Sequence, residues 1–228
     1  MKSRVVQSKK PVLLVGGGAI EADALSAALR AAETVVAADG GAARVLALGR
    51  MPDAVYGDMD SLPPDLQASL APGVLRPVTE QDSTDFDKCL RNIEAPLVIG
   101  HGFLGHRLDH QLAAMTVLAL RPERRCVLIG QEDVVMLCPP ALALDLAVGT
   151  RFSLYPMAQM TGRSEGLRWP LEGLRFAPSG VIGTSNVVCG PVRLWMDAAA
   201  MLLILPVACL NELLAGLAAA PAGWPARA

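Results

Sequence analysis

Short apolar runs recur along the first part of the chain, and each run ends in glycine or aspartate. The first three runs are Val12–Val15, Thr34–Ala38 and Ala54–Tyr56. Continuous apolar runs of this length are typical of strands that are buried on both faces. Residues 22–32 and 42–48 lie between these runs and repeat Leu and Ala at helical spacing. This alternation predicts βαβ units and therefore an α/β fold built on a parallel sheet.

The texture of the sequence changes near residue 138, where Cys138 is followed by two prolines. Beyond this point, short apolar runs are separated by Gly, Pro, Ser and Asn, and helical periodicity returns only at 210–217. Short strands at this spacing are typical of a small antiparallel sandwich or barrel. We therefore predict a Rossmann-like parallel α/β domain at residues 1–138, followed by a small antiparallel β-sandwich domain at 139–228.

Composition argues against several classes of protein. The 22 acidic and 20 basic residues give a formal net charge of −2, so we expect no nucleic-acid partner, which would require a basic surface. The five cysteines lack C-x-x-C spacing, which favours reduced thiols in the cytoplasm over a zinc site or a disulfide framework. We expect no signal peptide and no membrane span, because no run reaches the roughly 18 apolar residues that a span needs.

Acidic residues follow several of the predicted strands. They lie in Ala37-Ala38-Asp39-Gly40-Gly41, Gly57-Asp58-Met59-Asp60-Ser61, Asp82-Ser83-Thr84-Asp85 and the segment around Asp109. In an open parallel sheet, ligands bind outside the carboxyl ends of the strands, so these carboxylates should share one edge. Mg²⁺ prefers oxygen ligands and commonly binds together with substrate phosphates. The sequence therefore predicts a magnesium-dependent enzyme that acts on a nucleotide or another phosphate ester.

Asp58 and Asp60 are two residues apart, so both side chains point to the same side of an extended loop. Carboxylates at this spacing repel each other unless a cation lies between them. The alternative is a purely structural loop, in which Asp60 or Ser61 caps a helix that runs through Gln67. The other acidic loops favour the metal-binding interpretation.

Two groups of glycines follow predicted strands. Gly40 and Gly41 come directly after Asp39 and would let the backbone approach a ligand closely, although Asp39 could also cap the next helix. The three glycines at 16–18 invite comparison with the dinucleotide fingerprint G-x-G-x-x-G. That fingerprint requires a glycine where this chain has Glu21, so the match is weak.

Thr84 and Asp87 resemble a capping box, which predicts the start of a helix. Asp85 and Lys88 lie in that helix, three residues apart. They could face a cleft, with Asp85 as a metal ligand and Lys88 as a donor to phosphate. The alternative is a surface ion pair worth a few tenths of a kcal/mol.

A further helix is predicted at 108–120, with Arg107 and Asp109 at its first turn. Backbone N–H groups at a helix start favour anions, and a guanidinium suits phosphate oxygens. The predicted buried face of this helix consists of Leu108, Leu112, Met115 and Ala119. The histidines at 101, 106 and 110 are not spaced as a metal-ligand set.

Taken in order, these motifs resemble the thiamin pyrophosphokinase family. The matching segments are Asp39-Gly40-Gly41-Ala42, Gly57-Asp58-x-Asp60-Ser61, Asp82-x-Thr84-Asp85-x-x-Lys88 and Gly102-x-x-Gly105-x-Arg107-x-Asp109. They cover roughly residues 12–137 of the chain. In the second part, Gly183-Thr184-Ser185-Asn186 is similar to the Ser-Asn segment of the family's thiamin-binding β-domain.

The resemblance implies that ATP donates its pyrophosphoryl group to the hydroxyethyl oxygen of thiamin, giving thiamin diphosphate and AMP. It also implies a homodimer, because the family's thiamin site forms between two subunits. Mg²⁺ would be held by Asp39, Asp58, Asp60 and Asp85. Nucleotide phosphates would be bound by Gly40, Gly41, Lys88, Gly105 and Arg107, with Asp109 orienting the nucleophile. Thiamin would be bound by Gln81, Trp169, Ser185 and Asn186, although Trp169 could instead be a core aromatic of the second domain.

Two positions depart from the family pattern. His106 stands where a second glycine is usual before the arginine, and Gln131-Glu132-Asp133 stands where Asn-rich residues are common. The same acidic loops would also suit a pyrophosphokinase for another alcohol, such as a pterin, or a metal-dependent phosphohydrolase. A nucleotide-binding sensor without turnover is a further alternative, which the full set of acidic and basic residues argues against.

Overall fold

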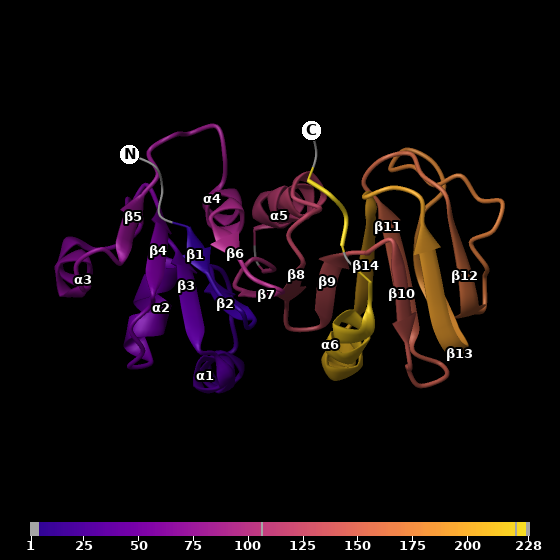
Figure 1. Ribbon diagram of the computed structural model, residues 1–228, viewed down its shortest axis with the longest axis horizontal. Helices are drawn as coiled ribbons and strands as arrows, with labels where there is room; N and C mark the ends of the chain where they lie inside the picture. The colour runs from indigo at the N-terminus through magenta and orange to yellow at the C-terminus, as the bar shows by residue number, and fades with distance from the viewer. Residues whose placement is uncertain (1–4, 106, 222, 227–228) are drawn as a thin grey trace. The chain divides into compact units, whose positions relative to one another are not determined.

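The computed structural model describes residues 5–105, 107–221 and 223–226 and divides into two compact units (Figure 1). The first unit runs to Val117 and takes in Cys126–Gln131, and the second comprises Leu118–Arg125 and the chain from Glu132 onward. His106, one of the two departures from the family pattern, lies outside the described residues. No helix in the described ranges is both long and apolar enough to cross a membrane.

The first unit contains a parallel sheet in the order β8-β7-β2-β3-β4-β5, as the apolar runs predicted. Its strands are β2 (Val12–Val15), β3 (Thr34–Ala38), β4 (Ala54–Gly57), β5 (Leu75–Pro77), β7 (Val98–His101) and β8 (Cys126–Ile129). The short strands β1 (Val6–Gln7) and β6 (Ile93–Glu94) form a separate parallel pair. Strand order reverses at β2, which lies between β3 and β7, so the crevice at its carboxyl end is the expected position for a ligand.

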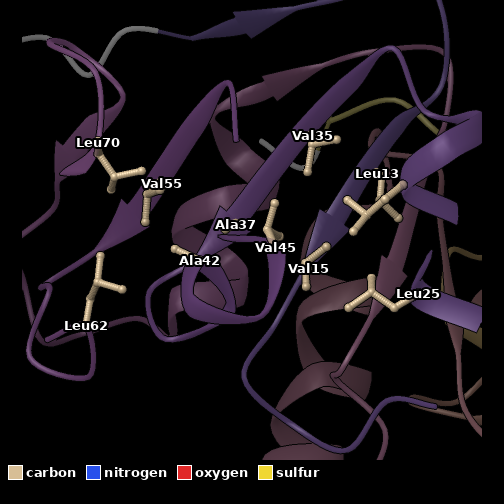
Figure 2. Packing of buried hydrophobic residues seen from close by; sticks show 11 residues of the cluster. Leu13, Val15, Leu25, Val35, Ala37, Ala42, Val45, Val55, Leu62 and Leu70 are labelled. Carbon is tan, nitrogen blue, oxygen red and sulfur yellow. The ribbon is translucent and has the colours of Figure 1, made fainter. Parts of the chain in front are cut away.

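Helices α1 (Ala22–Ala31) and α2 (Gly41–Ala47) pack on one face of this sheet, where buried side chains of β2, β3 and β4 meet those of the two helices (Figure 2). That face is formed by Leu13, Val15, Val35, Ala37 and Val55, which meet Leu25, Leu29, Ala42 and Val45. Each fully buried Val or Leu contributes about 1.5–3 kcal/mol by leaving water. Gly49, the predicted end of the second helix, has a φ of 74°, which suits its place after α2.

Three more helices belong to the α/β part of the chain: α3 (Pro64–Ser69), α4 (Asp85–Arg91) and α5 (Leu108–Leu120). The bounds of α5 are those predicted, but its predicted buried face is only partly correct: Ala119 is buried, whereas Leu108 and Leu112 are not. Leu108 and Leu112 are 67% and 59% exposed, and the buried residues are Ala114, Val117, Leu118 and Ala119. Apolar residues surround most of this helix, so their spacing does not single out one face.

The second unit is built on antiparallel strands in the order β10-β13-β11-β14-β9, with β12 also paired to β13. Its elements are β9 (Asp133–Leu137), β10 (Ala141–Leu144), β11 (Arg151–Pro156), β12 (Gly162–Leu167), β13 (Gly183–Met196), β14 (Met201–Pro206), the 3₁₀ turn η1 (Val207–Cys209) and α6 (Leu210–Ala219). The α6 helix confirms the predicted helix at 210–217. Strand β9 belongs to the second unit because it pairs with β14. The last crossing of the chain from the first unit to the second therefore follows Gln131, whereas the sequence analysis placed the boundary at residue 138.

Candidate metal and phosphate site

Asp39 follows β3 directly, at the carboxyl edge of the parallel sheet. Its φ of 40° is left-handed, and its side chain is only 3% exposed. Its Oδ2 accepts a hydrogen bond from the Ser61 backbone N–H at 3.2 Å, whereas its buried Oδ1 has no hydrogen-bond partner among the described residues. Burial raises the pKa of this carboxyl group above its ordinary value. A buried oxygen without a partner costs about 1–3 kcal/mol, so this geometry suits a ligand that the oxygen can bind.

Three carboxylates converge at this edge. Asp39, Asp58 and Asp60 each offer an oxygen, and these oxygens all lie within 4.8 Å of one another. Met59 between the latter two has a left-handed φ of 69°, so the loop turns sharply instead of continuing extended. Strained backbone of this kind concentrates at functional sites. The donor set consists of hard oxygens at close range, which fits a divalent cation such as Mg²⁺.

Local hydrogen bonds hold the loop that follows β4. Ser61 Oγ donates to Asp60 Oδ1 at 2.9 Å, and Gln81 Nε2 donates to Asp58 Oδ2 at 3.2 Å. The bond from Gln81 is the main reason that the pKa of Asp58 lies below its ordinary value. The alternative of a helix capped by Asp60 or Ser61 is wrong, because α3 begins only at Pro64. Ser61 instead supports the Asp39 carboxylate.

Helix α4 brings further charged groups to the same edge. Thr84 caps it, accepting a hydrogen bond from the Asp87 N–H at 3.2 Å, which confirms the predicted start of the helix. Lys88 is 2% exposed, and its Nζ lies 3.1 Å from Asp85 Oδ1. The charge of Asp85 adds to the effect of burial on the pKa of Asp39. Asp85 therefore lies within electrostatic range of Asp39, and Lys88 within electrostatic range of Asp58.

Glycines of the predicted site pack against neighbouring backbone. A Cβ on Gly40 would lie 3.3 Å from Ser61 Cβ, and one on Gly105 would lie 3.2 Å from Ala19 Cβ. A Cβ on Gly41 would overlap the backbone at the end of β2, so this glycine lets α2 approach the strand closely. Packing therefore requires glycine at position 41, whereas at positions 40 and 105 a Cβ would be only tightly accommodated. A direct contact of these glycines with a nucleotide stays a prediction.

The loop after β2 lies beside the loop after β7. The Gly16 N–H donates to the His101 carbonyl at 2.8 Å, and the Gly18 N–H donates to the Gly102 carbonyl at 3.0 Å. Arg44 Nη2 donates to the Gly17 carbonyl at 3.1 Å and ties this loop to α2. The sequence analysis did not single out Arg44, which lies three residues after the first residue of α2 and contacts the glycine loop after β2. The two loops lie at the carboxyl ends of β2 and β7, where strand order reverses.

Arg107 and Asp109 form an exposed ion pair at the start of α5. Arg107 Nη2 donates to Asp109 Oδ2 at 2.6 Å, and their side chains are 67% and 65% exposed. The hydrogen bond from Arg107 lowers the pKa of Asp109 to about 2. In the described part of the chain these two groups bond to each other and not to the acidic cluster.

The predicted thiamin-binding residues of the second unit form a separate group. The Asn186 side chain is buried, and its Nδ2 donates to the Trp169 carbonyl at 2.7 Å while its Oδ1 accepts from the Trp169 N–H at 3.2 Å. Ser185 has a left-handed φ of 62°, and its N–H donates to Ser153 Oγ at 3.0 Å. Trp169 is 53% exposed with Arg168 over its ring at 5.0 Å, so the core-aromatic alternative is wrong. Asn186 thus holds the backbone that presents the indole.

Comparisons with known proteins relate the chain to one family. Residues 25–128 match the family model of the thiamin pyrophosphokinase catalytic domain. Thiamine pyrophosphokinase 1 of Arabidopsis thaliana is 29% identical over 156 residues, a match that covers 60% of this chain and 58% of that protein. Thiamine pyrophosphokinase 3 of Oryza sativa subsp. japonica is 28% identical over 191 residues, covering 69% of this chain and 72% of that protein. The solved thiamin pyrophosphokinase from Candida albicans shares the fold, with a TM-score of 0.73 at 16% identity over 88% of this chain and 92% of that one.

Proposed function

We propose that the chain is a thiamin pyrophosphokinase, as its similarity to that family suggests, and that it transfers the pyrophosphoryl group of ATP to the hydroxyethyl oxygen of thiamin, giving thiamin diphosphate and AMP. The observation that carries this proposal is the cluster of Asp39, Asp58 and Asp60, which includes one buried oxygen without a partner. A phosphoryl-transfer enzyme needs few covalent groups of its own and depends on positioning and charge stabilisation. The cluster provides such a site at the sheet edge where ligands bind.

Asp39, Asp58 and Asp60 would hold Mg²⁺, and we propose that Asp85, whose charge acts on Asp39, would join them when the metal ion and nucleotide bind. When bound, the metal ion neutralises charge on the phosphates of ATP. The nearly buried Lys88 now bonds to Asp85 and would also donate to a phosphate oxygen. Arg107 would exchange part of its bond with Asp109 for phosphate oxygens, which a guanidinium matches in geometry.

The bond changes follow from the products. The thiamin hydroxyl oxygen attacks the β-phosphorus of ATP, and the bond from that phosphorus to the oxygen shared with the α-phosphate breaks, so AMP leaves. Asp109 would accept a hydrogen bond from the attacking hydroxyl. A carboxylate is a weak proton acceptor near neutral pH, so we assign Asp109 to orienting the nucleophile, and the hydroxyl proton is released to water.

We assign ATP and the metal ion to the parallel α/β unit and thiamin to the second unit, as a β-sandwich domain. The long strand β13 supports this layout, because its first part pairs with β11 and its last part with β10 and β12. The exposed indole of Trp169 suits the cationic, aromatic thiamin. Ser185, Asn186 and Gln81 are the other residues that we propose for thiamin binding.

We further propose a cytoplasmic homodimer. The resemblance implies a thiamin site shared by two subunits, and the exposed Leu108 and Leu112 on α5 supply apolar surface that a partner subunit would cover. Sedimentation of the purified protein at several concentrations tests this proposal. A monomer at all concentrations would contradict it.

Product analysis tests the reaction itself. The purified protein is incubated with Mg²⁺, ATP and thiamin, and a control omits thiamin. Thiamin-dependent formation of AMP together with thiamin diphosphate supports the proposal. ADP or free phosphate formed regardless of thiamin would indicate a kinase or hydrolase, AMP formed only with a pterin or other alcohol would indicate a different acceptor, and ATP binding without product would indicate a sensor.

A further inference from the structure

Glu80 lies in the loop that joins β5 to α4 (residues 78–84) and ties this loop to the end of α4. Arg91 Nη2 donates to both oxygens of the Glu80 carboxylate, at 2.8 Å and 3.0 Å, and Ser83 Oγ donates to the same carboxylate. Both members of the ion pair are partly buried, at 32% and 35% exposure of Arg91 and Glu80. No residue from 78 to 84 is fully buried, so polar bonds and not packing set the conformation of this loop.

This ion pair connects the loop that contacts Asp58 to the helix that carries Asp85. Glu80 is next to Gln81, whose Nε2 donates to Asp58 Oδ2 at 3.2 Å. Arg91 is the last residue of α4, the helix that carries Asp85 and Lys88 in its first turns. The Glu80–Arg91 pair therefore attaches the loop whose Gln81 bonds to Asp58 to helix α4, which carries Asp85.

We propose that Glu80 and Arg91 are positioning residues for divalent-cation binding, acting through Gln81 on Asp58. Groups that orient metal-binding carboxylates, without touching the metal themselves, change metal affinity by about 10–100-fold when they are removed. The ordinary alternative is an ion pair that contributes at most about 1 kcal/mol to stability and nothing to binding. The proposal rests on the proposed function only in taking the acidic cluster as a cation site.

The direction in which Arg91→Met changes cation affinity distinguishes a positioning role from simple electrostatics. Arg91 is a cation near a cluster of carboxylates, so its removal by Coulomb's law alone would strengthen the binding of another cation. Loss of the pair would instead free the loop, weaken the bond from Gln81 to Asp58, and so weaken cation binding. Arg91→Met therefore gives opposite results under the two explanations.

The experiment measures Mn²⁺ binding by electron paramagnetic resonance, with no nucleotide present. We expect Arg91→Met to bind Mn²⁺ about 10–100-fold more weakly than the wild type, and Arg91→Lys to recover part of the loss. Arg193→Met is the matched control, because Arg193 forms a more exposed pair with Glu165 at 4.0 Å in the second unit and should leave Mn²⁺ affinity unchanged. Equal or tighter binding by Arg91→Met overturns the proposal.

A double-mutant cycle tests the route through Gln81. Gln81→Ala should weaken Mn²⁺ binding, and Arg91→Met should add little to it, because both changes remove one chain of contacts. Fully additive losses overturn the route. Failure of the wild type to bind Mn²⁺ overturns both the proposal and its basis, whereas a wild type that binds Mn²⁺ but forms no AMP from ATP and thiamin refutes the proposed function alone.

Discussion

Gly57, the last residue of β4, is the position at which a single methyl group should disturb the acidic cluster most directly. Its φ of 154° is a conformation that residues with a Cβ rarely adopt. A Cβ added there would lie 2.8 Å from the Cβ of Asp39 and 3.3 Å from its Cα. Carbon atoms prefer separations of about 3.5–4.0 Å, so Gly57→Ala must push Asp39 or the end of β4 aside.

The cost of Gly57→Ala has two parts. The unfavourable backbone conformation costs about 1–3 kcal/mol, and forcing a methyl group into filled space costs about 1–3 kcal/mol more. We therefore expect a loss of about 2–6 kcal/mol in the free energy of unfolding. Gly49→Ala is the matched control, because Gly49 has a φ of 74° and no atom within 4 Å of the added Cβ. Only the backbone contribution, about 1–2 kcal/mol, applies there.

Circular dichroism monitors the urea unfolding of the wild type and both variants in the absence of metal. A separate titration measures the Mn²⁺ affinity of each protein. Gly57→Ala should lose more stability than Gly49→Ala and should bind Mn²⁺ more weakly, since Asp39 is displaced. Gly49→Ala should keep the metal affinity of the wild type. If the two variants lose equal stability, or if Gly57→Ala binds Mn²⁺ normally, the packing argument is refuted.

Three further predictions concern the site and its surroundings. The double variant of Asp58→Asn and Asp60→Asn should keep its fold by circular dichroism but form AMP roughly a thousandfold more slowly, because several kcal/mol of charge stabilisation is lost; near-normal rates would contradict the metal assignment. Burial lowers the pKa of His101 below its ordinary 6.5, so the unfolded chain takes up this proton first and the protein loses stability as pH falls below about 6.5. His101→Gln should remove that contribution, and urea unfolding at about pH 7.5 and pH 5 should show a smaller difference than in the wild type, whereas an unchanged difference would count against it. Trp169→Ala should change stability by no more than about 0.5 kcal/mol, because the indole is exposed, but weaken thiamin binding by about 0.5–2 kcal/mol in calorimetry; unchanged thiamin affinity would remove Trp169 from the site.

The spacing of apolar and capping residues correctly predicted several helices and strands of the first unit. The runs that predicted β2 and β3 have the observed bounds of those strands, and the start of α4 at its Thr84 cap could be read from four residues. These features depend on contacts within one strand, one helical turn or one cap, which neighbouring residues determine. The α/β class follows from the same periodicities.

Local pattern failed where several faces compete for burial. Helix α5 is apolar around most of its circumference, so its sequence does not show which side is buried. Tertiary packing buries Val117 and Leu118 and leaves Leu108 and Leu112 exposed. The hydrogen bonds of the Asn186 side chain to the Trp169 backbone join residues 17 positions apart, and no short motif could reveal them; its role in binding substrate stays a prediction.

The sequence by itself determined that this protein is an α/β chain with carboxylates after its parallel strands, because strand direction alone brings those ends to one edge. Only the tertiary structure decided which carboxylates meet: Asp39, Asp58 and Asp60 form the close group, while Asp85 pairs with Lys88. It also decided that the space beside Gly57 is filled by Asp39. Such distances depend on the twist of the sheet and on contacts between residues far apart in the chain, so they cannot be predicted from short sequence segments.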